Sequence, residues 1–554
     1  MSYNQRRISL QRQHGYLVMV AVLLILLVGT VCTALIGLFS GSETATINSL
    51  RADQAYYVAE AGFEETARLL LTPNLTGANN RIACAAITGT SALTNTDAGA
   101  GTFTATTVAG SPVYANTTLS GALNSSATTV SVASTTGFSA AGRIRIDNEI
   151  LNYGAISGNS FIGVQRGVNT TYSAPHVTAT PVVQYQCNVN VTAGIPSLTA
   201  PLSQRTLQQS WQLQEGWAGG VLSGANYVFT HWNRPTEAAW SADLVANSSA
   251  ATINSVSMLS NGDGWAVGNV VGKAFTILHW TGTTWDLVSA PTACSTQNLA
   301  GISAVYHNEA WAVGPATKST GNCNSPGGSR VYDVAYWNGT TWALLTPSTT
   351  PSVPADSGSN QDLNAVHVID TTHSGAGTLG FAVGNGGAIL QYNGSNWIND
   401  TSPTTNNLYG VYVVSATQAW AVGAAGTIIK WNGSTWSTVS SPTSTQLNSI
   451  AMLDYTQSGS AQTGWAVGNS GVAIYYNGST WTTSSTGSSA NLYDVALFTT
   501  SPDQDVWAVG AAGTMLHYNG SAWAAVTSNV STDLNAISLI PPQQYGFAES
   551  EIFP

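Results

Sequence analysis

An internal repeat in the C-terminal part of the chain constrains its fold more than any other sequence feature. The repeat is marked by the tetrapeptide Trp-Ala-Val-Gly, and each copy is followed by a strand-like segment and then by a turn and a Trp, as in the run from Trp431 to Trp436 with its Asn-Gly pair. A further strand precedes each copy, as at Leu408 to Val411. Four short strands in about 40 to 50 residues match the size of one β-propeller blade. The copies of Trp-Ala-Val-Gly begin at Trp265, Trp311, Trp420, Trp465 and Trp507, with Phe381-Ala-Val-Gly384 as a variant.

The two ends of the repeat region predict one further blade, for a total of seven. Residues 534–537 and 546–548 look like the first two strands of a blade, and residues 227–232 with Trp240 look like the last two. Joining them closes the ring and removes free sheet edges. The Asn-Gly pairs predict two-residue hairpin turns. We therefore predict a seven-bladed propeller over residues 217–554.

Composition favours a mainly β protein that binds no nucleic acid. Only 7% of residues are charged and the net charge is -11, so no basic patch is available for phosphates. No paired carboxylates, metal-spaced ligands or nucleophile elbow stand out. We therefore predict no enzymatic activity, no cofactor and no metal. The His residues of the repeats are predicted to be core or surface residues: His231, His279, His367 and His517.

The N-terminal segment predicts a long helix that begins in a membrane. Leu17 to Phe39 is almost wholly apolar, long enough for a bilayer core of roughly 30 Å, and Arg6, Arg7 and Arg12 precede it. Helical spacing of apolar residues continues from Ala52 to Leu70. We predict a leader over residues 1–15 and one helix over 16–72. A cleavable secretory signal is the alternative, although its apolar region is normally shorter.

The same segment resembles the type IV pilins, and among them the PilX-type minor pilins. The resemblance lies in the basic leader that ends at Gly15, the apolar run from Tyr16, and the stretch from Asn48 to Gly62. It implies cleavage after Gly15, methylation of Tyr16, and other pilins as partners. Major pilins carry Glu where this chain has Val20, which implies a place near the filament tip; the alternative is an ordinary signal anchor. The implied localisation is the inner membrane before assembly and the extracellular pilus or cell surface afterwards.

The middle of the chain predicts a small β domain with an insertion. Residues 73–116 and 184–216 would form a pilin-like sheet, and residues 117–183 a separate β module in which Glu149, Arg166 and His176 form either a site or a structural ion pair. Apart from Cys32, the Cys residues allow three disulfide pairings. Order along the chain favours Cys84 with Cys187, and Cys294 with Cys323.

The repeats resemble propellers of the photosystem assembly factor type and, more distantly, sialidase-like repeats. An arginine triad, which the sialidase resemblance would require, is absent, because residues 218–554 contain only Arg234 and Arg330. We predict a propeller that binds a surface, a glycan or a protein partner; an inert structural propeller and a hidden hydrolase are the alternatives. The candidate binding residues lie in the longest loops and at their ends: Lys318, Arg330 and Asp356.

Overall fold

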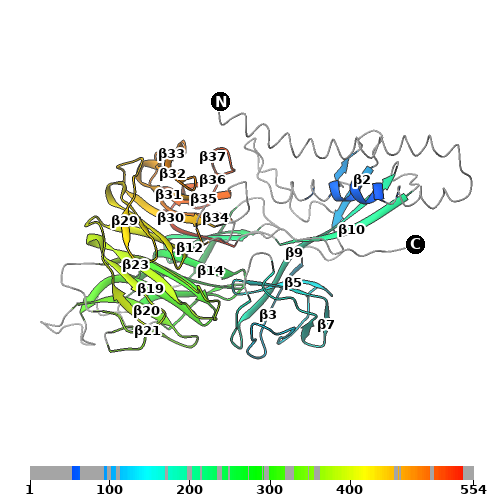
Figure 1. Ribbon diagram of the computed structural model, residues 1–554, viewed down its shortest axis with the longest axis horizontal. Coiled ribbons are helices and arrows are strands. Elements are labelled where there is room, and N and C mark those ends of the chain that lie inside the picture. Colours follow the sequence, from blue (N-terminus) through cyan, green and yellow to red (C-terminus); the bar gives the residue numbers. More distant parts are fainter. Residues whose placement is uncertain are drawn as a thin grey trace, which may run out of the picture.

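In the computed structural model, the strands of the described residues form seven four-stranded sheets, one seven-stranded sheet and one three-stranded sheet. Figure 1 shows their arrangement. The sheets of four lie together as a β-propeller, and the larger sheet lies beside it. The structure describes residues 51, 53–62, 66, 93–95, 102–107, 113–168, 173–195, 203–212, 215–233, 240–246, 250–271, 274–289, 291, 298–318, 330–346, 348–354, 362–454, 459–460, 463–498 and 505–540.

Six blades are formed by four strands that follow one another along the chain. The first strand of each blade contacts the first strands of both neighbouring blades, so these strands line the centre of the ring. Blades two to four contain β14 (Ile253–Ser260), β15 (Asp263–Val271), β16 (Ala274–Trp280), β17 (Trp285–Leu287), β18 (Gly301–Tyr306), β19 (Glu309–Lys318), β20 (Arg330–Trp337), β21 (Trp342–Leu344), β22 (Leu363–Ile369), β23 (Leu379–Gly384), β24 (Ile389–Tyr392) and β25 (Trp397–Asn399).

Blades five to seven repeat this arrangement. In blades four to seven a short 3-10 turn links the second strand to the third: η3 (Asn385–Gly387), η4 (Ala424–Gly426), η5 (Asn469–Gly471) and η6 (Ala511–Gly513). The strands are β26 (Leu408–Ser415), β27 (Gln418–Gly423), β28 (Ile428–Trp431), β29 (Trp436–Thr438), β30 (Leu447–Leu453), β31 (Thr463–Gly468), β32 (Ala473–Tyr476), β33 (Trp481–Ser484), β34 (Leu492–Phe498), β35 (Asp505–Gly510), β36 (Met515–Tyr518) and β37 (Trp523–Ala525).

Blade one closes the ring with one strand from the C-terminal side and three from the N-terminal side. The innermost strand is β38 (Leu534–Ile540), which pairs with β11 (Glu215–Ser223); β12 (Asn226–Asn233) and β13 (Ser241–Ala246) follow outwards. The sequence predicted a propeller, and the propeller is confirmed. The closing blade differs from the expected two-plus-two division, because β11 occupies the place predicted for residues 546–548, which lie outside the described residues.

The glycine that ends each Trp-Ala-Val-Gly copy is required by a close backbone approach. A Cβ atom on Gly423 would lie 2.0 Å from the carbonyl oxygen of Asn407, and one on Gly220 of β11 would lie 2.0 Å from that of Asp533. Gly423 has φ -169°, which is ordinary extended backbone, so space rather than conformation excludes a side chain. The equivalence of Gly220 and Gly423 identifies Trp217 to Gly220 as a seventh, divergent copy of the repeat.

The aromatic residues of the repeat fill the space between blades. Trp420 of blade five packs against Tyr476 and Trp481 of blade six, with ring centroids 4.9 and 5.7 Å apart. Trp465 of blade six packs in the same way against Trp523 of blade seven, at 5.1 Å. Each such pair contributes roughly 0.5–1.5 kcal/mol beyond the burial of its area. The repeat therefore encodes contact between blades as well as the blades themselves.

The Asn-Gly turns span four residues rather than the predicted two. Trp431 pairs with Trp436, and the Asn432 side-chain Oδ1 accepts hydrogen bonds from the backbone N–H groups of Ser434 and Thr435 at 3.0 and 2.9 Å. Gly433 alone in this turn has positive φ, at 98°. The asparagine is thus selected for its side-chain oxygen.

The seven-stranded sheet is organised by β9 (Pro181–Ile195), whose two halves pair with different strands. The strands before and after β9 are β1 (Leu93–Asn95), β2 (Thr102–Thr107), β3 (Val113–Thr118), β4 (Thr129–Ser131), β5 (Gly142–Ile146), β6 (Glu149–Tyr153), β7 (Ala155–Ser157), β8 (Ser160–Ile162) and β10 (Ser203–Gln212). Strands β4, β7 and β8 form the separate three-stranded sheet. Residues 119–182, here called the β module, share one apolar core that includes Val130, Ile146 and Phe161.

A short helix over residues 53–62 lies on the β2–β9 part of the sheet (Figure 1). Ala55 and Ala59 are fully buried, and a Cβ on Gly62 would lie 2.6 Å from Val191 and 2.8 Å from Phe103. Small residues at this spacing therefore let the helix backbone approach the sheet.

The prediction of one long helix over residues 16–72 that anchors the chain in a membrane is wrong. The α-helical residues that the structure describes fall between 51 and 66, and no helix among the described residues is both long enough and apolar enough to cross a bilayer. The predicted leader and the apolar run from 17 to 39 lie outside the described residues. The inner-membrane localisation rested on that helix and is withdrawn with it.

Candidate functional site at the junction of the β module and the propeller

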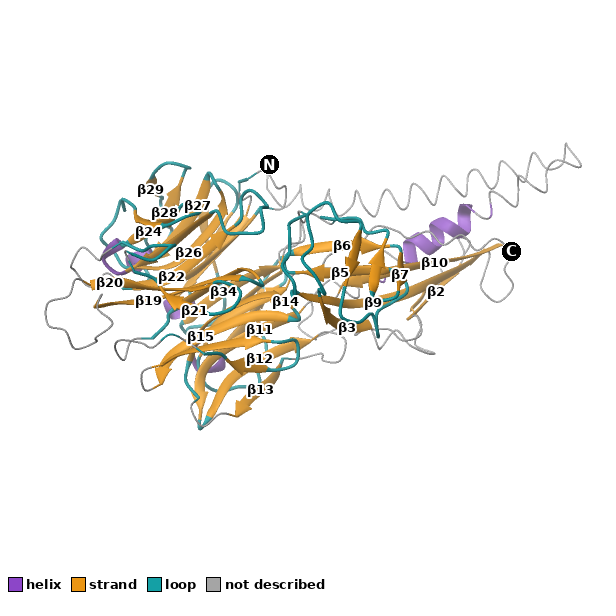
Figure 2. Cartoon of the chain, turned by 90° about the horizontal axis from the view of Figure 1, so that it is seen from below, coloured by secondary structure: helices purple, strands orange, loops and turns teal. Residues whose placement is uncertain are grey.

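The β module contacts the propeller through the tight turn between β5 and β6. Asp147 in this turn has φ 50°, a left-handed conformation that Asp tolerates better than most residues. Its Oδ1 accepts a hydrogen bond from the backbone N–H of His307 at 2.9 Å, and His307 lies in the turn between β18 and β19. The side chain of Asn148 donates to the Val305 carbonyl at 3.4 Å. Figures 1 and 2 both show the module side by side with the propeller.

Glycines on the propeller allow this close contact. A Cβ on Gly262 would lie 2.6 Å from Val183, and one on Gly375 would lie 2.7 Å from Pro175. The junction is therefore a packed interface between two parts of one chain.

Inside the module, buried charges hold the loop that faces the propeller. Arg166 forms two hydrogen bonds with the Glu149 carboxylate, at 2.7 and 2.6 Å, and Arg166 also donates to the Ala174 carbonyl at 2.6 Å. His176 lies between Glu149 and Asp147, at 2.8 Å from each carboxylate. The structure thus brings together the three residues that the sequence singled out and adds Asp147.

The electrostatics of this cluster favour an ion network. Burial would raise the pKa of Glu149, but hydrogen bonds from Arg166 and His176 outweigh it and leave the pKa lowered. Burial would lower the pKa of His176, but hydrogen bonds to Asp147 and Glu149 leave the pKa raised. Both His176 ring nitrogens face carboxylate oxygens, which a doubly protonated ring satisfies. Because these groups are committed to one another, the cluster acts as a structural support for the junction.

A cavity of about 320 Å³ lies where the module meets the inner strands β18 and β22. The module contributes Asn148, Glu149 and Ala174 to its wall, and the turn after β22 contributes Asp370 and His373. This volume lies at the small end of the range of ligand pockets.

Asp370 and His367 are ionisable side chains in the wall of this cavity. Burial would raise the pKa of Asp370, but hydrogen bonds from the N–H groups of Thr372 and Gly375 leave the pKa lowered. His367 is also in the wall, and burial lowers its pKa to about 4, so this ring is neutral at neutral pH. No Lys or Arg is among the residues that line the cavity in the described part of the chain.

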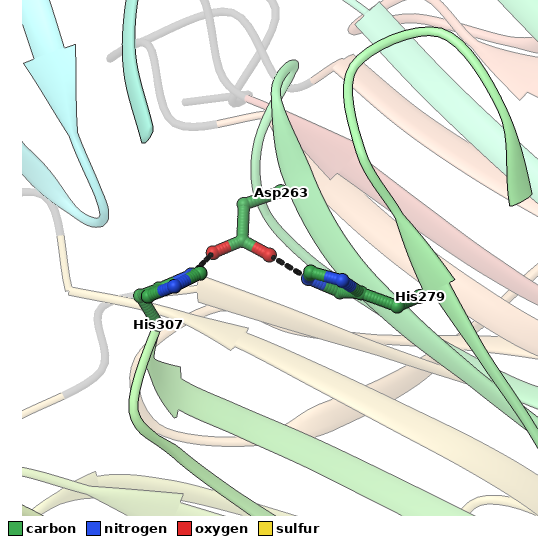
Figure 3. Close-up of side chains that lie close together, drawn as sticks. All are labelled: Asp263, His279 and His307. Atoms are coloured by element: carbon green, nitrogen blue, oxygen red, sulfur yellow. Dashed lines mark hydrogen bonds and ion pairs between the residues drawn. The ribbon is translucent and has the colours of Figure 1, made fainter. Parts of the chain in front are cut away.

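Next to the Asp147 contact, one carboxylate on the propeller faces two imidazole rings (Figure 3). Asp263 opens β15 and is 1% exposed. Its Oδ1 lies 2.7 Å from Nε2 of His279 on β16, and its Oδ2 lies 2.7 Å from Nδ1 of His307. Burial would raise the pKa of Asp263, but these two hydrogen bonds leave the pKa lowered. Burial would lower the pKa of His307, but the Asp263 carboxylate leaves the pKa raised.

Part of this arrangement is a property of the repeat. In blade seven, Asp505 lies 2.6 Å from Nε2 of His517, and His517 stacks on Trp507 at 4.3 Å. In blade two, His279 stacks on Trp265 in the same way, at 4.2 Å. The Asp–His pair thus recurs at equivalent positions. What distinguishes blade two is the second imidazole, from His307.

Most of the site residues that the sequence predicted lie away from this junction or outside the described residues. Cys187 is fully buried and disulfide-bonded, while its predicted partner Cys84 lies outside the described residues, so the pairing stays a prediction. Lys318 and Arg330 are register partners in the β19–β20 hairpin. The remaining predicted positions lie outside the described residues: Gly15, Tyr16, Val20, Cys294, Cys323 and Asp356.

Sequence reasoning missed Asp263 and His307 and treated His279 as an isolated residue. The signal that was available is the acidic residue two positions before the repeat Trp, which is Asp263 in blade two and Asp505 in blade seven. The position of His307 follows only from the packing of blade three against blade two and the module.

Comparisons with known proteins add no family. No protein-family model matches the chain, and no curated protein matches it. Solved structures that resemble it include "YCF48 bound to D1 peptide", 18% identical over 56% of this chain and 86% of that one, with TM-score 0.36. YCF48 from Cyanidioschyzon merolae is 15% identical over 51% and 87%, with TM-score 0.35. The WD40 β-propeller domain of Doa1 is 13% identical over 54% and 94%, with TM-score 0.37.

Proposed function

We propose that this chain is a binding protein, and that the cavity at the junction takes a positively charged group of a protein ligand, such as a Lys or Arg side chain or an amino terminus. The observation that carries the proposal is the pair of carboxylates, Glu149 and Asp370, in the wall of one 320 Å³ cavity that no Lys or Arg lines in the described residues. A cation placed there would be attracted mainly by the Asp370 carboxylate, which accepts hydrogen bonds from backbone N–H groups and the Tyr306 hydroxyl, because the Glu149 charge is already paired with Arg166 and His176.

The site is suited to binding rather than to chemistry. Glu149 is held by Arg166 and His176, and Asp370 is held by backbone N–H groups, so both carboxylates stay ionised and fixed in position. Neither carboxylate is poised near neutral pH for proton transfer, because both pKa values are lowered. We therefore extend the sequence expectation of no enzymatic activity to this site.

A basic protein segment fits this cavity better than a neutral or acidic glycan. The net charge of the chain is -11, so long-range attraction also favours a positively charged partner. A role as a minor pilin depended on the long N-terminal helix and does not form part of the proposal.

Binding of synthetic peptides to the purified full chain tests this function. The peptides share one sequence and differ at a single position that carries Lys, Arg, Gln or Glu. We expect the Lys or Arg peptides to bind, and Asp370→Asn to weaken them by about tenfold, which corresponds to about 1.4 kcal/mol. The matched control is Asp286→Asn, which removes an exposed carboxylate on β17 outside the cavity wall.

Two results would overturn the proposal. Equal binding of the Lys and Glu peptides would show that charge does not select the ligand. A glycan that binds the chain and is unaffected by Asp370→Asn would place the binding site elsewhere.

A further inference from the structure

The two carboxylate–imidazole clusters at the junction differ in a way that matters for metal binding. In the module cluster, His176 uses opposite ring nitrogens for Asp147 and Glu149, so the two carboxylates lie on opposite sides of the ring. In the propeller cluster, Asp263 faces two imidazoles, and the ligand atoms of Asp263, His279 and His307 all lie within 4.8 Å of one another. Three donor atoms thus converge in the second cluster only.

The donor set suits a transition metal. Two imidazole nitrogens and one carboxylate oxygen are typical ligands of zinc and of related divalent ions. Within the described residues, this is the one group of three His, Cys, Asp or Glu side chains with ligand atoms at such spacing. The Asp263 side chain is 1% exposed while both imidazoles are 20% exposed, so the cluster is anchored in the core and reachable from solvent.

The surrounding structure holds the donors in place. His279 is stacked on Trp265, and the backbone of His307 is fixed from two sides. The His307 N–H donates to Asp147 of the module, and the His307 carbonyl accepts from Trp337 Nε1 at 3.0 Å. Such supporting contacts orient metal ligands and raise their affinity.

Blade seven provides a comparison within the same molecule. The Asp505–His517 pair shows that the repeat forms an Asp–His hydrogen bond at this position, at 2.6 Å. The third donor of blade two is an addition to that pair, and it comes from a neighbouring blade. Stabilising a blade therefore does not account for His307 turning toward Asp263.

We propose that Asp263, His279 and His307 bind one divalent transition-metal ion of the zinc class. The donors are a carboxylate oxygen of Asp263, Nε2 of His279 and Nδ1 of His307, each imidazole binding in its neutral form. Three protein ligands leave a fourth position for water. Because the backbone of His307 also holds Asp147, the ion ties blades two and three to the β module.

Titration of the metal-stripped full chain with Co²⁺, followed by displacement with Zn²⁺, tests the site. We expect one equivalent of Co²⁺ to produce a saturable visible absorption band, and Zn²⁺ to remove it. His279→Gln and His307→Gln should each weaken Zn²⁺ binding by at least about tenfold. His517→Gln, which alters the equivalent pair in blade seven, should bind as the unaltered chain does.

Each outcome of the experiment is decisive. The proposed site is wrong if the unaltered chain takes up no stoichiometric Co²⁺ or Zn²⁺, and this result does not depend on the variants. Binding that survives both His279→Gln and His307→Gln, or that His517→Gln reduces equally, also overturns it. The two variants change imidazoles that are 20% exposed, and a thermal unfolding scan of each before titration separates ligand loss from misfolding.

Discussion

Asp147 accepts a hydrogen bond from the backbone N–H of His307 at 2.9 Å, across 160 positions of the chain. The same carboxylate faces His176 at 2.8 Å, so one buried side chain links the core of the β module to the turn between two propeller strands. Because a buried carboxylate requires partners, these contacts fix how the two parts dock.

Removing the Asp147 carboxylate should loosen the junction. Asp147→Ala leaves His176 facing one carboxylate instead of two and leaves the His307 N–H without its acceptor. We expect a loss of about 3 kcal/mol in the free energy of unfolding of the module. Hydrogen exchange would report it as faster exchange in both β5–β6 and the β18–β19 turn. Asp286→Asn, which changes an exposed carboxylate, is the control. If Asp147→Ala speeds exchange in the module but not in the β18–β19 turn, docking through this contact is contradicted.

The repeat glycine should tolerate no side chain. Gly423→Ala would place a Cβ 2.0 Å from the Asn407 carbonyl oxygen, so the inner strand of blade five must move. We expect a loss of about 3 kcal/mol or more in the free energy of unfolding. Urea unfolding followed by Trp fluorescence measures it. Gly121→Ala is the matched control, because a Cβ there meets nothing within 4 Å; equal effects at the two positions would rule out the steric explanation.

The propeller should become less stable as pH rises through about 6, because of Asp494 on β34. This carboxyl group is buried, and burial raises its pKa to about 6 from 3.8, against hydrogen bonds from Ser449 and from the backbone N–H groups of Ile537 and Val495. A raised folded-state pKa favours the protonated form. The stability that the protonated Asp494 contributes to the folded state is therefore fully present below pH 3.8 and is lost as the pH rises through about 6. Its size is about 3 kcal/mol.

Asp494→Asn separates this effect from other titrations. The variant should lose the part of the pH dependence that lies between about pH 4 and pH 6, as measured by urea midpoints across that range. Asp286→Asn should keep the full dependence. If the urea midpoint depends on pH in Asp494→Asn as it does in the unaltered chain, Asp494 ionises as an ordinary carboxyl group.

The propeller was predictable from sequence because each blade is encoded locally. Gly423 and Asn432 act within a blade, Trp420 packs against the next blade along the chain, and the same spacing recurs in other blades. The second strand of the closing blade was missed because Trp217 to Gly220 departs from the repeat and is separated from its partner β38 by most of the domain.

The candidate site depended on contacts that no local pattern records. Asp263 and His307 are 44 positions apart and meet because blade three packs against blade two. Asp147 reaches His307 because two parts of the chain dock. The N-terminal prediction failed for a different reason: the apolar run from 17 to 39 and the helical periodicity of residues 52–70 were joined into one long helix, whereas the α-helical residues described are confined to positions 51–66.

The position of β38 has a consequence during synthesis. Its partner strand β11 leaves the ribosome about 320 residues earlier, since β11 begins at Glu215 and β38 at Leu534. While blades two to seven are translated, the edge of β11 that later pairs with β38 has no partner strand. This edge can pair with a strand from another nascent chain. Loss of β38 would therefore leave the other three strands of blade one beside an open ring, with an unpaired inner edge that favours association with another chain.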